Sequence, residues 1–252
     1  MEEDLSKLAG NAPQYGPANA GRAEGSPLQG KHLCFLGSSV TEGACSLDVS
    51  FVEYLAERNG FSYVKEAVSG TTLTDTGEDS YVSRLKSRIN RSEAFDLFFC
   101  QLSTNDASRG LPLGTVSSWY SPEEFDVRTI TGAVEYIIVY VKENWNCPVV
   151  FYTGTKFESP LYDQMVKTLL KLQEKYGIGV IDLWNNREMN EISEEKYQLY
   201  MHDPIHPVQA GYLKWWTPVM EDCLFRLMGG GKIRGTAEGC SPERGNGEGK
   251  LC

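Results

Sequence analysis

The 252-residue sequence predicts an α/β fold, in which helices cover both faces of a mostly parallel sheet. Two observations lead to this class. Short apolar runs alternate along the chain with longer amphipathic stretches, which is typical of strand–helix–strand units. The runs are apolar nearly throughout, as expected for strands that are buried on both faces.

About five strands and five main helices are expected. The strands are predicted at residues 32–37, 61–68, 95–102, 147–153 and 179–184. The helices are predicted at residues 50–58, 79–89, 126–144, 161–172 and 212–227. In the fourth helix, Leu161, Met165, Leu169 and Leu172 recur at helical spacing.

The chain divides into three parts. Residues 1–30 are rich in Gly, Ala, Pro and Asn without hydrophobic periodicity, which predicts a flexible N-terminal arm. Residues 31–228 are expected to form one folded domain, and no internal repeat is present. Residues 229–252 are polar and Gly-rich, which predicts a disordered tail.

Composition excludes several classes of partner. The formal net charge of −10 argues against a nucleic-acid partner and against an anionic membrane surface. No apolar stretch has the length of a signal peptide or a transmembrane helix. The seven cysteines are widely spaced without a CxxC pair, and Cys34, Cys100 and Cys147 lie in or beside apolar runs. We therefore expect a soluble cytoplasmic protein, and the sequence does not predict its oligomeric state.

Polar segments follow the first three strands. These are residues 37–43, 69–72 and 103–106, and a fourth polar segment, 202–207, precedes the last helix. In parallel sheets, sites form at the carboxyl ends of the strands. The four segments are therefore expected to meet at one edge of the sheet.

Their residues are those that acyl transfer from an ester requires. Ser39 is the candidate nucleophile, and because a serine hydroxyl is a poor nucleophile at neutral pH, it needs an adjacent base. His206 is the candidate base, and Asp203, three residues earlier, could orient it. The N–H groups of Ser39 and Gly70 and the side-chain amide of Asn105 could hold the oxyanion.

The four segments resemble the blocks of the SGNH/GDSL-type serine hydrolase family, in a Gly-Ser-Ser variant of the first block. The resemblance runs from Gly37 to about Pro207 and implies a flavodoxin-like three-layer α/β/α sandwich. It also implies no metal and no cofactor, and it assigns to the catalytic residues the roles given above. Ser38 stands where the family name places Asp, and Ser103 stands where Gly is common.

Other interpretations of single residues remain open. Residues 37–39 alone could be a strand-to-helix turn with capping serines, and Asp203 could cap the following helix. His202 is a less favoured base than His206 because it directly precedes Asp203, and His32 is expected at the far edge of the sheet. Asp182 is the main competitor for the role of the acid.

The expected activity is hydrolysis of carboxylic esters with short, acetyl-like acyl groups on a carbohydrate or small molecule. Residues 107–124 form a long irregular segment that we expect to shape the pocket, with Arg109 and Trp119 as candidate substrate-binding residues. Two alternatives remain: an acyltransferase that uses the same residues, and a non-catalytic carbohydrate- or small-molecule-binding module.

Overall fold

A parallel sheet of five strands forms the centre of residues 4–228, which are the residues that the computed structural model describes. The strands are β1 (His32–Gly37), β2 (Ser62–Ala67), β3 (Leu97–Gln101), β4 (Val149–Tyr152) and β5 (Gly179–Ile181). Their order is β2-β1-β3-β4-β5, and every pair is parallel. This is the flavodoxin-like order, so the predicted fold class is confirmed.

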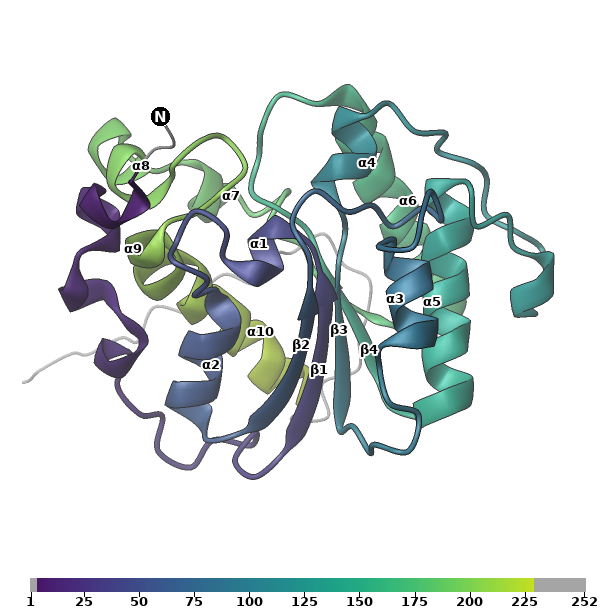
Figure 1. Ribbon diagram of the computed structural model, residues 1–252, viewed down its shortest axis with the longest axis horizontal. Coiled ribbons are helices and arrows are strands. Elements are labelled where there is room, and N and C mark those ends of the chain that lie inside the picture. Colours follow the sequence, from purple (N-terminus) through teal and green to yellow (C-terminus); the bar gives the residue numbers. More distant parts are fainter. Residues whose placement is uncertain (1–3, 229–252) are drawn as a thin grey trace, which may run out of the picture.

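Helices cover both faces of the sheet (Figure 1). One layer holds α2 (Phe51–Asn59) and α10 (Thr217–Met228) with the π-helical turn η6 (Tyr212–Trp216) that leads into α10. The other layer holds α3 (Tyr81–Ser87), α5 (Ile130–Trp145) and α6 (Pro160–Tyr176). The shorter elements are α1 (Ser39–Glu42), α4 (Thr104–Ser108), η5 (Pro122–Glu124), α7 (Arg187–Asn190), α8 (Glu194–Tyr200) and α9 (Gln209–Gly211).

The strands explain why the sequence shows continuous apolar runs. Successive side chains of a strand point to opposite faces, and here each face packs against its own helical layer. In β3, Phe98 faces the layer of α3, α5 and α6, whereas Phe99 faces the layer of α2 and α10. Phe99 stacks on Phe35 of β1 with ring centroids 4.9 Å apart. Both layers are therefore fixed by the central strands.

Helix boundaries follow from capping residues. The Ser50 hydroxyl accepts a hydrogen bond from the N–H of Val52, and the N–H of Ser50 donates to the Glu53 carboxylate, which forms a capping box at the start of α2. The helix ends at Asn59 and is capped by Gly60, whose φ of +68° lies in the left-handed region. The predicted helix 50–58 therefore lies within one residue of α2 at each end.

The N-terminal segment differs from the predicted flexible arm. It forms four consecutive 3₁₀ turns, η1 (Leu5–Lys7), η2 (Ala9–Asn11), η3 (Pro13–Tyr15) and η4 (Pro17–Asn19). Asn11 is buried and bonds to the Cys45 carbonyl oxygen and to the N–H of Gln209. Three-residue turns have no 3.6-residue repeat, so the sequence carried no periodic signal for them. The predicted tail, 229–252, lies outside the described residues.

Within residues 4–228, no helix combines the length and the apolar character that crossing a bilayer requires.

Candidate active site

The first polar segment makes a sharp turn from β1 into α1, which begins at Ser39. A Cβ at Gly37 would lie 1.7 Å from Thr41 Oγ1, so only glycine lets α1 pack this closely on the strand end. Gln101, the last residue of β3, accepts hydrogen bonds from the N–H of Ser38 (2.9 Å) and from the Thr41 hydroxyl (2.8 Å). The turn that presents Ser39 is therefore held by the neighbouring strand.

Ser39, His206 and Asp203 form a continuous hydrogen-bonded chain. Ser39 Oγ lies 2.7 Å from His206 Nε2, and His206 Nδ1 lies 2.7 Å from Asp203 Oδ2. Asp203 Oδ1 accepts hydrogen bonds from the N–H groups of Ile205 and His206. Partial burial disfavours the charged carboxylate, but the hydrogen bonds from the His206 ring and these two N–H groups outweigh it and lower the pKa of Asp203 to about 2.

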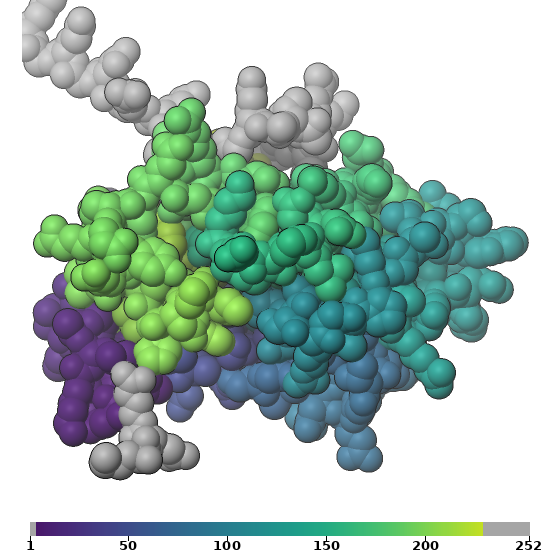
Figure 2. Space-filling model, turned by 90° about the horizontal axis from the view of Figure 1, so that it is seen from above, coloured from purple at the N-terminus to yellow at the C-terminus, as the bar shows by residue number. Residues whose placement is uncertain are grey.

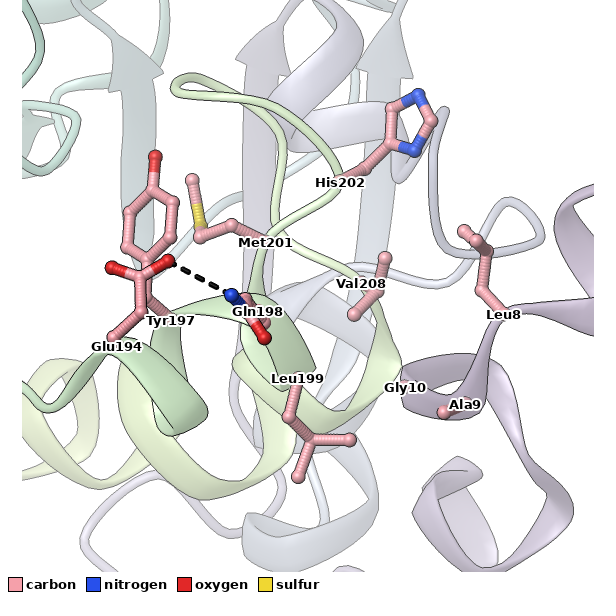
Figure 3. A pocket seen from close by; sticks show the side chains of 10 residues that line it. All are labelled: Leu8, Ala9, Gly10, Glu194, Tyr197, Gln198, Leu199, Met201, His202 and Val208. Atoms are coloured by element: carbon pink, nitrogen blue, oxygen red, sulfur yellow. Dashed lines mark hydrogen bonds between the residues drawn. The ribbon is translucent and has the colours of Figure 1, made fainter.

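The other two histidines lie elsewhere. His202 lines a separate pocket of about 530 Å³ between α8 and the N-terminal segment, and neither Ser39 nor His206 lines that pocket (Figure 3). His32 begins β1 at the opposite edge of the sheet, and its ring bonds to Glu93 over 3.0 Å. The geometry therefore favours His206 as the partner of Ser39.

Asp182 does not compete as the acid in this structure. One of its carboxylate oxygens accepts from the N–H of Asn185 and the other accepts from the Asn185 side chain. These bonds form a local turn after β5. Of the two candidate acids, Asp203 is the one that contacts the His206 ring.

The second and third polar segments lie side by side, as predicted. Gly70 has a φ of +76°, a backbone conformation that favours glycine. Asn105 lies on α4, and its Nδ2 donates to the carbonyl oxygen of Thr71 over 2.9 Å. Ser103, which stands where the resembled family often has glycine, caps α4 by accepting from the N–H of Asn105. The two residues proposed to hold an oxyanion, Gly70 and Asn105, are thus brought together.

Arg109 also reaches this region, whereas Trp119 does not. The Arg109 guanidinium is exposed and donates to the Gly70 carbonyl oxygen over 2.6 Å. Trp119 is 61% exposed, and its carbonyl oxygen accepts from Lys175 in the last turn of α6. Figure 1 shows the chain after α4 running along the outside of α5 and α6, away from α1. Trp119 is therefore not placed beside Ser39, because Lys175 holds its segment on the outer helical layer.

Two acidic residues outside the predicted catalytic set stabilise the site. Asp106 is fully buried and accepts from the N–H groups of Leu73 (2.8 Å) and Thr74 (3.1 Å). Burial raises the pKa of Asp106, although these hydrogen bonds oppose the rise. Glu42 of α1 accepts from the N–H of Ser69 over 3.0 Å. Both carboxylates hold the loop that carries Gly70 in place. In the sequence, the only sign of this role is that the two residues lie close to predicted site residues.

The face that carries these segments is seen in Figure 2, which looks onto the carboxyl edge of the sheet. The light-green part of the chain, which includes α8 and the following loop, lies beside the purple N-terminal segment. Contacts of η2 with α8 and α9 agree with this view. The loop that carries Asp203 and His206 is closed on itself by a hydrogen bond of 2.9 Å from the His202 N–H to the His206 carbonyl oxygen.

Comparisons with solved structures support the fold. A Lactobacillus plantarum protein shares 19% identity with this chain at a TM-score of 0.61, over 80% of this chain and 97% of that one. A protein designated a GDSL-like lipase from Bacteroides ovatus shares 17% identity at a TM-score of 0.56, over 75% and 95%. A family two carbohydrate esterase from Clostridium thermocellum in complex with cellohexaose shares 17% identity at 0.54, over 80% and 66%.

Sequence comparison identifies the family. No curated protein sequence matches the chain. The model of the GDSL-like lipase/acylhydrolase family matches residues 35–214, which include all four polar segments described above. The chain therefore belongs to the GDSL-like lipase/acylhydrolase family.

Proposed function

We propose that the protein is a serine esterase that hydrolyses short-chain carboxylic esters through an acyl-enzyme intermediate. The observation that carries this proposal is the chain of two 2.7 Å contacts from Ser39 Oγ to His206 and from His206 to Asp203. Membership of the GDSL-like lipase/acylhydrolase family supports ester hydrolysis as the reaction class.

In this mechanism His206 Nε2 takes the proton of Ser39 as Oγ attacks the ester carbonyl carbon. Asp203, hydrogen-bonded to Nδ1, keeps Nε2 free to accept that proton and stabilises the imidazolium that forms. His206 then gives the proton to the leaving alcohol. Water, activated by the same ring, attacks the acyl-enzyme and releases the acid and Ser39.

The tetrahedral intermediate needs donors for its oxyanion. The N–H of Ser39 is at the start of α1, where helix N–H groups have no partner within the helix. The N–H of Gly70 and the second hydrogen of Asn105 Nδ2, whose first hydrogen is bonded to Thr71, would complete the set. Each such donor is worth about 10²–10³-fold in rate.

We propose short acyl groups on a carbohydrate as the substrate class. Ser39 is only 6% exposed, which favours a small group at the nucleophile. The likeness to a carbohydrate esterase solved in complex with cellohexaose supports a sugar as the alcohol part. Arg109 at the rim offers a charged group to a polar substrate.

Covalent labelling tests the nucleophile. A fluorophosphonate probe should modify the full-length protein at Ser39 and should fail on Ser39→Ala. Ser38→Ala is the matched control: within the described residues, the buried Ser38 hydroxyl makes no hydrogen bond to His206 or Asp203, so its loss should leave labelling intact. Labelling that persists in Ser39→Ala would show that the mechanism is wrong.

A substrate series tests the class of ester. p-Nitrophenyl acetate should be hydrolysed with a higher kcat/KM than the butyrate and octanoate esters, and acetate should be released from an acetylated cello-oligosaccharide. A preference for octanoate would contradict the short-acyl proposal. Products in which an added sugar carries the acetyl group would instead identify an acyltransferase.

We also propose that the protein is located in the cytoplasm. The buried free thiols of Cys34, Cys100 and Cys147 favour a reducing cytoplasm, whereas the disulfide-bonded Cys223 counts against it. Cell fractionation with an antibody to the full-length protein would test this, and recovery outside the cytoplasmic fraction would contradict it.

A further inference from the structure

The proposed catalytic base is one of three neighbouring side chains that carry different metal-binding atoms. They are Cys45, Asp203 and His206, and one ligand atom of each lies within 4.8 Å of those of the other two. Tetrahedral Zn²⁺, with bonds of about 2.0–2.3 Å, requires ligand atoms about 3.3–3.6 Å apart. Binding one Zn²⁺ would therefore require the three atoms, which all lie within 4.8 Å of one another, to adjust to that spacing.

We propose that Cys45, Asp203 and His206 form a binding site for a borderline-soft divalent cation such as Zn²⁺, and that the bound cation inhibits the esterase. A thiolate, an imidazole and a carboxylate are the donor types that Zn²⁺ takes in proteins, and water can supply a fourth ligand. The metal has no role in ester hydrolysis here. It competes with that reaction for His206.

The backbone that carries Cys45 is held firmly in place. The φ of Gly43 is +92°, and a Cβ at this residue would lie 2.5 Å from the Val49 carbonyl group. Only glycine therefore fits at this position of the loop. Asn11 Nδ2 donates to the Cys45 carbonyl oxygen over 3.0 Å, and Gln209 Nε2 donates to the Ser46 carbonyl oxygen over 3.3 Å. The N-terminal segment and α9 thus position Cys45 beside the loop of His206 before any metal binds.

Binding would remove the base whichever ring nitrogen is used. The Cys45 thiol releases its proton to water and binds as a thiolate, and neutral His206 binds through a ring lone pair. If Nδ1 binds, the proton on Nδ1 moves through solvent to Nε2, which can then no longer accept the proton of Ser39. If Nε2 binds, the metal occupies that atom directly.

Cobalt binding tests the site without reference to activity. Metal-free full-length protein, titrated with Co²⁺, should take one equivalent and develop a thiolate-to-cobalt charge-transfer band. Cys45→Ser should lose the band, whereas Cys147→Ser, which removes a buried thiol elsewhere, should keep it. A wild-type protein without the band, or a band that survives in Cys45→Ser, would overturn the site.

A measurement on the unmodified chain covers the case in which Cys45→Ser does not fold. Zn²⁺ should protect Cys45 from iodoacetamide at least about tenfold, as measured by peptide mass spectrometry. Equal alkylation rates with and without Zn²⁺ would overturn the proposal.

The proposal that the bound cation inhibits the enzyme rests on the proposed function. The rate of p-nitrophenyl acetate hydrolysis with Zn²⁺ is compared with the metal-free rate of the same protein. By this measure Zn²⁺ should inhibit Cys45→Ser at least about tenfold more weakly than the wild type. Equal sensitivity would overturn inhibition through this site. A protein that gives the cobalt band but hydrolyses no ester would overturn the proposed function and still support the metal site.

Discussion

The guanidinium of Arg84 donates a hydrogen bond of 2.8 Å to the carbonyl oxygen of Gly37, two residues before Ser39. The Arg84 side chain is fully buried, and it also donates to Thr71 Oγ1 over 3.0 Å and pairs with the Glu66 carboxylate over 3.2 Å. One side chain thus joins the turn that carries Ser39 to the loop that carries Gly70. The relative position of the proposed nucleophile and the proposed oxyanion donors depends on this connection.

Arg84→Met should lower the free energy of unfolding by about 3–5 kcal/mol, because it leaves the buried acceptors of Arg84 without their charged partner. Urea denaturation would measure this loss. Arg88→Met is the matched control, since Arg88 lies one turn further along and pairs with Glu66 and Asp79 at an exposed site. The control should lose about 1 kcal/mol or less. Equal losses in the two variants would show that the buried contacts of Arg84 stabilise the folded state no more than the exposed contacts of Arg88.

Asn105→Ala should reduce kcat for p-nitrophenyl acetate by about 10²–10³-fold with little change in KM, because the amide acts on charge that develops in the transition state. Steady-state kinetics on the two proteins measure this split. Ser108→Ala, at the other end of α4, removes only a hydrogen bond to the Thr104 carbonyl oxygen and should retain wild-type rates. A rise in KM at unchanged kcat would instead indicate that Asn105 binds the ground-state substrate.

The sequence predicted the long elements and the order of the polar segments because both leave local signals. The predicted strand 32–37 coincides with β1, and the parallel sheet follows from the alternation of strands and helices. The short helices α1 and α4 are less than two turns long, so they show no hydrophobic repeat. Ser39 and Asn105 were therefore predicted only as parts of polar segments after strands, although each lies on a helix.

Other features of the site depend on contacts between distant segments. Arg84 is a basic residue on an amphipathic helix, and its burial follows from packing against β1, 47 positions away. Asp106 follows Asn105 directly, but its bonds to the N–H groups of Leu73 and Thr74 join two loops that sequence spacing does not relate. Trp119 was expected at the rim because it follows Asn105 in the chain, whereas its contact with Lys175 places it on another surface.

Arg109→Ala should reduce kcat/KM about fivefold, because the lost hydrogen bond to the Gly70 carbonyl oxygen is exposed and worth about 1 kcal/mol. Trp119→Ala, a change in the same long segment, should leave kcat/KM within about twofold of the wild type. Kinetics with an acetylated oligosaccharide and with p-nitrophenyl acetate measure both effects. A larger loss in Trp119→Ala than in Arg109→Ala would mean that residues 107–124 close over the site when substrate binds.

The pKa of Asp203 predicts how stability changes in acid. Its value of about 2 in the folded protein lies below the ordinary value of 3.8. The ionised carboxylate therefore stabilises the folded state at pH values above about 4, and this contribution is lost as the pH falls toward 2. Asp203→Asn has no such group, so the difference in unfolding free energy between the wild type and this variant should be larger at pH 5 than at pH 2.

Urea denaturation at several pH values between 2 and 5 would measure this difference. Asp182→Asn provides the control, because Asp182 bonds to Asn185 in a separate turn and not to His206. At pH 7, Asp203→Asn should also lower kcat on the order of 10²-fold or more, since an amide can hold His206 in the wrong tautomer and cannot stabilise the imidazolium. If the Asp203→Asn protein had full activity, the 2.7 Å contact between Asp203 and His206 would contribute only to the stability of the loop.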